Sequence, residues 1–258
     1  MTAQLVFLTG ASSGIGQALA LRFARAGWRL GLVARRGAEL QAWADAQGWT
    51  PAQACVYAAD VRDVRAIVDA GRACIAQQGL PDVVVANAGI SVGFDTADFD
   101  DLEVLRSVFE TNNLGMAATF HPFVAAMRER GDGRLVGVAS VAGIRGLPGH
   151  GAYCASKAAA ISYCESLRVE CAPSGVKVVT LLPGYIDTPL TRGNRYSMPF
   201  LMPVEAFADR AFAAIVAGDS WRVIPWQMGV VAKLLRLLPN ALFDKALSRR
   251  GRKRRREE

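Results

Sequence analysis

Residues 4–16 have the sequence "QLVFLTGASSGIG", in which an apolar run passes directly into a glycine-rich turn. A continuous apolar run is typical of a strand buried on both faces of a sheet. Gly10, Gly14 and Gly16 would let the chain turn tightly and approach a pyrophosphate, with a helix N-terminus supplying free N–H groups. Three glycines alone are a weak signal, because a tight strand-to-helix turn needs them without any ligand. Their position after the first strand favours a dinucleotide site.

Strand and helix patterns alternate along the rest of the chain. Further apolar runs lie at 29–34, 53–59, 82–87, 134–140, 176–182 and 221–226. Helical patterns lie near 14–26, 37–48, 62–78, 100–130, 153–172 and 203–217. This alternation predicts an α/β fold, a single-domain doubly wound parallel sheet of Rossmann type with about seven strands and helices on both faces. We expect that domain at 1–226, an apolar helical extension at 227–248 and a basic, disordered tail at 249–258.

Composition limits the class of protein. The 258 residues, 52% of them hydrophobic, suit one domain with an ample core. No run of about 18 apolar residues predicts a membrane span, and the N-terminus does not resemble a signal peptide, so a cytoplasmic location is the default. Five cysteines without CxxC spacing and two histidines predict reduced thiols and no metal site.

The net charge of +7 is concentrated at the C-terminus. Residues 249–258, "RRGRKRRREE", contain seven basic and two acidic residues, and so supply +5 of it. The remaining chain is nearly balanced, and the tail has no aromatic residues. We therefore expect no nucleic-acid partner.

The end of the second predicted strand bears on the choice of dinucleotide. An acidic residue there would bind the ribose 2′-OH of NAD, whereas an arginine can pair with the 2′-phosphate of NADP. The segment "LVARR" has Ala34 at that place, followed by Arg35 and Arg36. Two solvated arginines at a helix start are the plain alternative, but cations are unfavourable at a helix N-terminus. NADP(H) is therefore favoured over NAD(H).

The segment "YCASK" at 153–157 carries a candidate acid–base pair. Tyr153 and Lys157 are four residues apart and share one helix face. A tyrosine pKa near 10 is too high for a base at neutral pH, and a nearby ammonium would lower it. The pair alone is a weak signal, because solvated tyrosine–lysine pairs are common.

Two further polar positions accompany this pair. Ser140 ends the fifth predicted strand, thirteen residues before Tyr153, and a glycine-rich loop between them could bring the two hydroxyls together. Asn112 and Asn113 lie inside a predicted helix, where asparagine is unfavourable, and indicate a kink able to hold a water.

Together these elements resemble the short-chain dehydrogenase/reductase family in its compact form, over roughly residues 4 to 226. The resemblance rests on six ordered motifs with Ser140: "TGASSGIG", "DV" at 60–61, "ANAG" at 86–89, "NNLG" from Asn112, "YCASK", and "PGYIDT" at 183–188. The chain departs from the family in one place, since Ala86 stands where "NNAG" is frequent.

The resemblance implies a role for each matching position. Tyr153 would be the general acid/base, Lys157 would lower its pKa and bind the nicotinamide ribose, and Ser140 would polarise the carbonyl. Asn112 would hold a water in a proton relay to Lys157. The implied cofactor-binding residues are Gly10, Ser12, Ser13, Gly14, Ile15, Gly16, Arg35, Arg36, Asp60, Val61, Asn87, Ala88, Gly89, Tyr153, Lys157, Pro183, Gly184, Ile186 and Thr188.

The expected activity is NADP(H)-dependent hydride transfer between a ketone or aldehyde and an alcohol. The polar loop at 188–203 also carries Tyr196, Met198, Phe200, Leu201 and Met202, typical of a lid over a hydrophobic lipid or sterol ketone. Packing of the lid onto its own domain explains these residues equally well, and His150 suits either the pocket or the surface. A 3-oxoacyl-thioester reductase and a non-catalytic NADP-binding regulator remain alternatives.

The apolar segment 226–238, with Trp221 nearby, has three interpretations. It can cover its own core, pack on a partner subunit of a homodimer or homotetramer, or bind an anionic membrane together with the basic tail. Packing on itself or on a subunit is preferred. Residues 226–258 would otherwise make a peripheral contact with the inner membrane surface.

Overall fold

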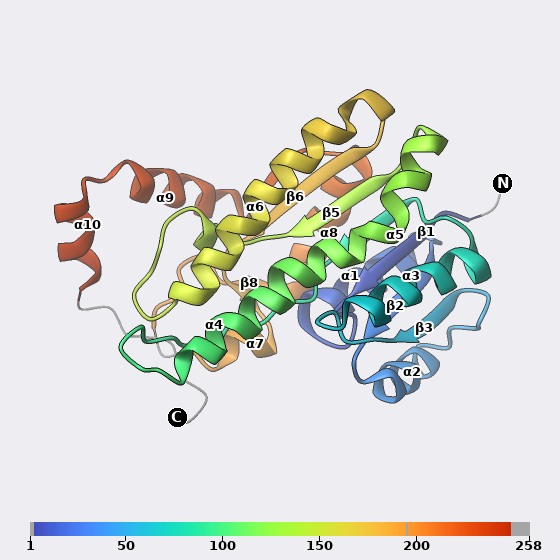
Figure 1. Ribbon diagram of the computed structural model, residues 1–258, viewed down its shortest axis with the longest axis horizontal. Coiled ribbons are helices and arrows are strands. Elements are labelled where there is room, and N and C mark those ends of the chain that lie inside the picture. The colour runs from blue at the N-terminus through green and yellow to red at the C-terminus, as the bar shows by residue number, and fades with distance from the viewer. Residues whose placement is uncertain (1–2, 195, 249–258) are drawn as a thin grey trace.

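Seven parallel strands form the central sheet, as the alternating pattern predicts (Figure 1). The computed structural model describes residues 3–194 and 196–248. The strands are β1 (Leu5–Thr9), β2 (Arg29–Ala34), β3 (Ala54–Ala58), β4 (Val83–Ala86), β5 (Arg134–Val138), β6 (Lys177–Pro183) and β9 (Trp221–Ile224). Their order is β3-β2-β1-β4-β5-β6-β9, so the winding reverses between β1 and β4. In open α/β sheets, ligands bind at the carboxyl ends of the strands beside such a reversal.

Helices cover both faces of the sheet, because each strand buries side chains on both sides. On β1, Val6 and Leu8 join the core under α1 (Gly14–Arg25), α2 (Gly37–Ala46) and α8 (Val204–Ala217). Leu5 and Phe7 point to the other face, where they join the core under α3 (Val64–Gln78), α5 (Gly115–Arg130) and α6 (Gly151–Cys171). Helix α4 (Asp101–Phe109) packs against α6. The α/β prediction is confirmed.

The predicted long helix near 100–130 is interrupted. Helices α4 and α5 are joined by η1 (Glu110–Leu114), a π-helical turn that contains both asparagines. The departure from α-helical geometry lies at the asparagine pair, as the sequence predicted. Within this turn, the side chain of Asn112 is buried in the protein. Single π-helical turns inside α-helices are often associated with functional sites.

Short elements follow the strands that carry the site. The 3₁₀ turns η2 (Val141–Gly143) and η3 (Ala172–Ser174) follow β5 and α6. After β6, a two-stranded sheet pairs β7 (Ile186–Asp187) with β8 (Met202–Pro203), and α7 (Pro189–Arg192) lies between them in sequence. These elements give fixed structure to both ends of the predicted lid.

Two helices follow the last strand. Helix α9 (Trp226–Leu237) ends where Leu238 is extended, and α10 (Asn240–Leu247) begins after Pro239. They project beyond the carboxyl ends of the strands, at the left of Figure 1. Within the described part of the chain, no helix has the length and hydrophobicity that crossing a membrane requires. The predicted tail at 249–258 lies outside the described residues.

Candidate active site

The glycine-rich turn passes so close to the end of β4 that side chains would not fit. Gly10 has a φ of +69°, and a Cβ there would lie 2.8 Å from Nδ2 of Asn87. A Cβ on Gly16 would lie 2.1 Å from the carbonyl oxygen of Gly10. The glycines therefore let β1, the turn and α1 pack closely, which leaves the start of α1 open to a ligand.

Hydrogen bonds fix the turn against the segment after β4. Asn87 donates through Nδ2 to the carbonyl oxygens of Thr9 (3.1 Å) and Gly10 (3.3 Å). The hydroxyl of Thr9 accepts from the backbone N–H of Asn87 (3.2 Å) and Ala88 (3.3 Å). Thr9 was not among the predicted site residues, although its position as the last residue of the strand was the available signal. These bonds hold the crevice between β1 and β4 in one shape.

A cavity of about 590 Å³ opens along the carboxyl ends of the strands. It is lined by every predicted cofactor residue except Gly16, which is buried behind the turn. The residues concerned are Gly10, Ser12, Ser13, Gly14, Ile15, Arg35, Arg36, Asp60, Val61, Asn87, Ala88, Gly89, Tyr153, Lys157, Pro183, Gly184, Ile186 and Thr188. An elongated ligand with two phosphates and two sugars suits a cavity lined by a helix N-terminus, hydroxyls and arginines. The residues present therefore fit a dinucleotide.

Three charged side chains lie at the end of the cavity beside β2 and β3. Arg62 donates to Oδ2 of Asp60 from Nε (3.1 Å) and from Nη2 (2.7 Å), and its Nε also donates to Oδ1 (3.3 Å). Arg35 lies 3.9 Å from the same carboxylate, with its side chain 61% exposed. Burial alone would raise the pKa of Asp60, but the hydrogen bonds and charge of Arg62, with the charge of Arg35, outweigh it and lower that pKa. Arg62 was missed in the sequence, where nothing but its place after "DV" marks it.

Arg36, the other predicted phosphate ligand, forms an ion pair with Glu39 at 2.7 Å. Both side chains are more than half exposed, and Arg36 lines the cavity. An exposed pair of this kind contributes little to stability, so Arg36 can be redirected at low cost.

Ser140 and Tyr153 meet at the inner end of the cavity. Ser140 lies two residues beyond β5, where its hydroxyl accepts from the N–H of Ala142 (3.2 Å) and donates to the carbonyl oxygen of Pro183 (3.4 Å). Burial raises the pKa of Tyr153 to about 12, and a hydrogen bond with Ser140 opposes that rise. The glycine-rich loop thus brings the two hydroxyls together, as its sequence predicted.

Lys157 lies on the same face of α6 but does not lower the pKa of Tyr153 in this chain. Its ammonium donates to the carbonyl oxygen of Val138 (2.8 Å) and lies 5.8 Å from the centroid of the Tyr153 ring. Burial lowers the pKa of Lys157 to about 8. The expectation of a lowered tyrosine pKa is wrong for the chain alone, because desolvation disfavours the charged form of both groups and no ammonium contact offsets it at Tyr153.

Asn112 joins three parts of the site without lining the cavity. Its Nδ2 donates to Ser156 Oγ (2.9 Å) and to the carbonyl oxygen of Ile90 (3.0 Å), and its Oδ1 accepts from the N–H of Ile90 (2.8 Å). A Cβ on Gly89 would lie 3.2 Å from Asn112 Oδ1 and 3.4 Å from Lys157 Nζ. Asn112 is therefore close to Lys157 and fixes the segment after β4 to α6. Ser156, which sequence reasoning missed, shares in that contact.

A second pocket of about 140 Å³ adjoins the cavity at Ser140 and Tyr153. Its lining is mainly apolar and comes from the loop after β5, the segment after α7 and helix α9. Helix α9 supplies Met228, Val231, Ala232 and Leu235. The pocket therefore places apolar surface next to the two hydroxyls that can bind a carbonyl oxygen.

His150 lines this pocket and is buried. Its Nδ1 lies 3.0 Å from the carbonyl oxygen of Pro148, and its Nε2 lies 3.1 Å from the hydroxyl of Tyr196. A carbonyl can only accept, so Nδ1 donates to Pro148. Of the five lid residues noted in the sequence, only Tyr196 lines the pocket. Phe200 and Leu201 are exposed and Met202 is buried in the core under α8.

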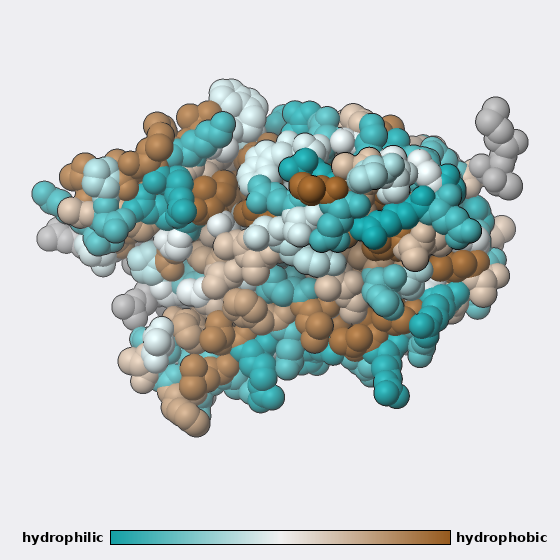
Figure 2. Space-filling view, turned by 45° about the horizontal axis from the view of Figure 1, so that its top comes forward, coloured by the Kyte–Doolittle hydropathy of each residue, from teal (hydrophilic) through white to brown (hydrophobic). Residues whose placement is uncertain are grey.

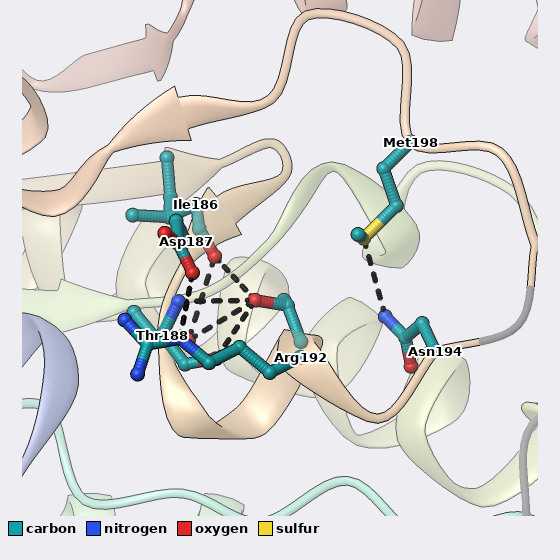
Figure 3. Close-up of polar contacts among 7 residues, drawn as sticks. Ile186, Asp187, Thr188, Arg192, Asn194 and Met198 are labelled. Carbon is teal, nitrogen blue, oxygen red and sulfur yellow. Dashed lines mark hydrogen bonds and ion pairs between the residues drawn. The ribbon is translucent and has the colours of Figure 1, made fainter.

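The start of the lid is held by its own hydrogen bonds (Figure 3). The backbone N–H of Thr188 donates to Thr191 Oγ1 (3.1 Å), which in turn donates to the carbonyl oxygen of Ile186 (2.6 Å). Arg192 donates to Asp187 (2.9 Å), and Asn194 contacts the sulfur of Met198 at 3.6 Å. Thr188 and Thr191 therefore form a fixed edge of the cavity.

The described residues contain neither a metal-binding cluster nor a disulfide. Residues 3–194 and 196–248 contain no group of three or more His, Cys, Asp or Glu side chains arranged to hold a metal ion. All five cysteines are free thiols.

Comparisons with known proteins agree with this geometry. Residues 4–198 match the family model described as short chain dehydrogenase. The chain is 41% identical over 249 residues to an uncharacterized oxidoreductase of Myxococcus xanthus, covering 96% of this chain and 98% of that protein. It is 36% identical over 195 residues to estradiol 17-beta-dehydrogenase 1 of Rattus norvegicus, covering 73% of this chain and 56% of that protein. A short chain dehydrogenase from Burkholderia cenocepacia, solved in complex with NADP, has a TM-score of 0.81 at 25% identity, covering 95% and 98% of the two chains.

Proposed function

The chain belongs to the short-chain dehydrogenase/reductase family and is an oxidoreductase, and from that premise we propose that it reduces a hydrophobic ketone or aldehyde to an alcohol with NADP(H). One observation carries the proposal. Ser140 and Tyr153 lie where a dinucleotide-sized cavity meets an apolar pocket. A carbonyl group held there would contact both hydroxyls.

The shape and charge of the larger cavity support NADP(H) as the cofactor. Ala34 leaves no carboxylate at the end of β2 to bind a ribose 2′-OH, and Arg35 lines the cavity one residue later. A guanidinium can bind a phosphate through two parallel hydrogen bonds. The Burkholderia relative binds NADP, which agrees with this preference.

The roles proposed for the side chains follow from their protonation states. Bound NADPH supplies a hydride to the carbonyl carbon. Tyr153 keeps its proton at neutral pH, because its pKa is raised to about 12, and can donate it to the carbonyl oxygen. Ser140 donates a hydrogen bond to the same oxygen and stabilises the negative charge that develops there. Lys157, with its pKa lowered to about 8, can pass a proton toward Tyr153.

The apolar pocket supports a hydrophobic substrate. Four side chains of α9 form one wall, and Ile144 and Leu147 of the loop after β5 add to it. The name of the rat relative indicates a steroid alcohol, which agrees with such a substrate. A 3-oxoacyl-thioester reductase remains the alternative within the class, and an NADP-binding regulator without turnover remains the alternative outside it.

We also propose a homo-oligomer, as a dimer or tetramer, and a peripheral contact of residues 226–258 with an anionic lipid surface on the cytoplasmic side. The outward face of α9 carries Trp226, Val230, Leu234 and Leu237, all exposed, at spacings of four, four and three residues (Figure 2, upper left). Exposed Lys233 and Arg236 flank this stripe. A two-fold contact through the same face would bring like charges together, so the stripe suits lipid better than a second copy.

A substrate panel tests the proposed reaction. Oxidation of NADPH and of NADH would be followed with long-chain 3-oxo lipids, steroid ketones, small aldehydes and quinones, each lipid both free and as a thioester. Turnover with NADPH on free apolar ketones is the expected result. A requirement for the thioester would favour the acyl reductase, and no turnover despite NADPH binding would favour the regulator.

A further inference from the structure

The guanidinium of Arg145 joins the loop after β5 to both C-terminal helices. Nη1 donates to the carbonyl oxygen of Leu238 at 2.8 Å and also to that of Leu235, and Nη2 donates to Oδ1 of Asn240 at 3.0 Å. The plane of the guanidinium lies over the ring of Phe243, with Cζ 3.7 Å from the ring centroid. One side chain thus contacts the end of α9, the start of α10 and the body of α10.

This contact satisfies groups that the end of a helix leaves unpaired. Helix α9 ends at Leu237, so the carbonyl groups of its last turn have no partner within the helix. A cation at a helix C-terminus is also favourable because the helix dipole places partial negative charge there. No ion pair within the described residues includes Arg145, and its guanidinium instead contacts these carbonyl groups and the aromatic ring.

Helix α9, one of the two helices that Arg145 contacts, forms a wall of the apolar pocket. Met228, Val231, Ala232 and Leu235 lie on the inner face of α9, which also packs against η2. Arg145 itself lies on the pocket lining, five residues after Ser140. The loop that carries the hydroxyl of Ser140 therefore also holds the opposite wall in place.

We propose that Arg145 is a positioning residue that locks α9, together with the adjoining α10, in the place where α9 walls the apolar pocket, and thereby sets the size of the ketone that the pocket accepts. The part of this proposal that concerns the ketone rests on the function proposed above. The lock between the helices does not, because it follows from the contacts of the guanidinium alone. Releasing α9 would widen the pocket without moving Tyr153, Lys157 or the cofactor cavity.

Direct binding of an acidic substrate is a different role that the contacts disfavour. Both terminal nitrogens of Arg145 already donate to the C-terminal helices, and one face of the guanidinium is covered by Phe243. A substrate carboxylate would have to displace these partners. The two roles differ in what happens to the helices when the side chain is changed.

Hydrogen–deuterium exchange of the full-length protein tests the lock without any substrate. In Arg145→Gln, amides of residues 226–248 should exchange about tenfold faster or more, since hydrogen bonds from a charged group are lost. Asn240→Ala removes one acceptor only and should give a smaller increase in the same segment. Arg72→Gln, which removes an exposed arginine paired with Asp69 on α3, is the matched control and should leave this segment unchanged.

Kinetics on the ketone panel test the effect on specificity. Arg145→Gln should raise KM for the best long apolar ketone about tenfold, and should reduce the ratio of kcat/KM for long ketones to that for short ketones. Both kcat and the Kd of NADPH should stay within about twofold of wild type. Unchanged exchange at 226–248 in both variants would overturn the lock. A KM effect confined to acidic ketones, without faster exchange, would assign Arg145 to substrate binding instead. If wild type reduces nothing, the proposed reaction fails, while the exchange result still decides the lock.

Discussion

The ammonium nitrogen of Lys157 lies 5.8 Å from the centroid of the Tyr153 ring, one turn further along α6. Burial favours the uncharged form of both groups, so it lowers the pKa of Lys157 to about 8 and raises the pKa of Tyr153 to about 12. The phenol is therefore protonated at neutral pH, whereas the lysine is close to losing its charge. A site in this state suits donation of a proton to a carbonyl oxygen more than removal of one from an alcohol.

The lowered pKa of Lys157 predicts how stability changes with pH. Between about pH 8 and pH 10.5, the unfolded chain holds a proton on this lysine that the folded chain has lost. Because the unfolded state then binds more protons, the free energy of unfolding should rise with pH, by about 1 kcal/mol per pH unit. Below pH 8 both states hold the proton and the folded chain bears the cost of a buried charge.

Urea unfolding of wild type and Lys157→Met at pH 7, 8, 9 and 10 measures this slope. The difference between the two proteins removes the contributions of other groups that titrate in the same range. The free energy of unfolding of Lys157→Met, relative to that of wild type, should be greatest at pH 7, and the difference should shrink as the pH rises. Parallel curves would mean that Lys157 keeps its ordinary pKa.

Arg35 should determine the preference for NADPH over NADH. Arg35→Ala should raise KM for NADPH about tenfold or more and leave KM for NADH nearly unchanged, because only the former has a phosphate for the guanidinium to bind. Arg72→Ala is the matched control, since Arg72 lies on α3 outside the cavity lining and is paired with Asp69. If the ratio of the two KM values is the same in Arg35→Ala as in wild type, the phosphate is bound elsewhere, with Arg62 as the first candidate.

Asn112 should contribute to stability through its bonds to Ile90 and Ser156. Asn112→Ala removes the buried bond to Ser156 and leaves half-buried backbone groups of Ile90 without their side-chain partner, so it should lower the free energy of unfolding by about 1 to 3 kcal/mol. Asn113→Ala provides the comparison. Asn113 donates one bond to the carbonyl oxygen of Ser156, while its own Oδ1 has no protein partner. Equal losses in the two variants by urea unfolding would contradict a special role for Asn112.

The inner face of α9 should limit the space for substrate. Leu235→Trp places a larger side chain in the pocket of about 140 Å³ and so reduces the space for substrate. The substitution should raise KM for long ketones strongly and leave the Kd of NADPH unchanged. Leu234→Trp places the same side chain on the exposed outer face of the same helix and should leave both constants near those of wild type. If the two variants behaved alike in steady-state kinetics, the substrate would bind outside this pocket.

Sequence patterns predicted most of the fold because strands buried on both faces have continuous apolar runs. The strand candidates at 29–34 and 176–182 agree with β2 and β6 to within one residue, and the asparagine pair marked the π-helical turn. The residues around the cavity were also predictable, because their motifs follow directly after strands. Tyr153 and Lys157 were correctly expected on one helix face.

Contacts between distant segments were not predictable from the sequence. The ion pair of Asp60 with Arg35 and the bond from Lys157 to Val138 depend on how strands and helices pack. The pKa of Tyr153 went the wrong way in the sequence expectation, because spacing along a helix says nothing about desolvation. Arg145 had no recognisable pattern around it, since its partners are 90 to 98 residues away.

The rate of NADPH oxidation by Tyr153→Phe, with the best ketone from the panel, tests the central claim most directly. Removal of the hydroxyl should lower kcat by about 100-fold or more, because the carbonyl oxygen loses its proton donor. The Kd of NADPH, measured by fluorescence on the same preparation, should stay within about twofold of wild type. A variant that binds NADPH and turns over at close to the wild-type rate would contradict the assignment of Tyr153 as the proton donor.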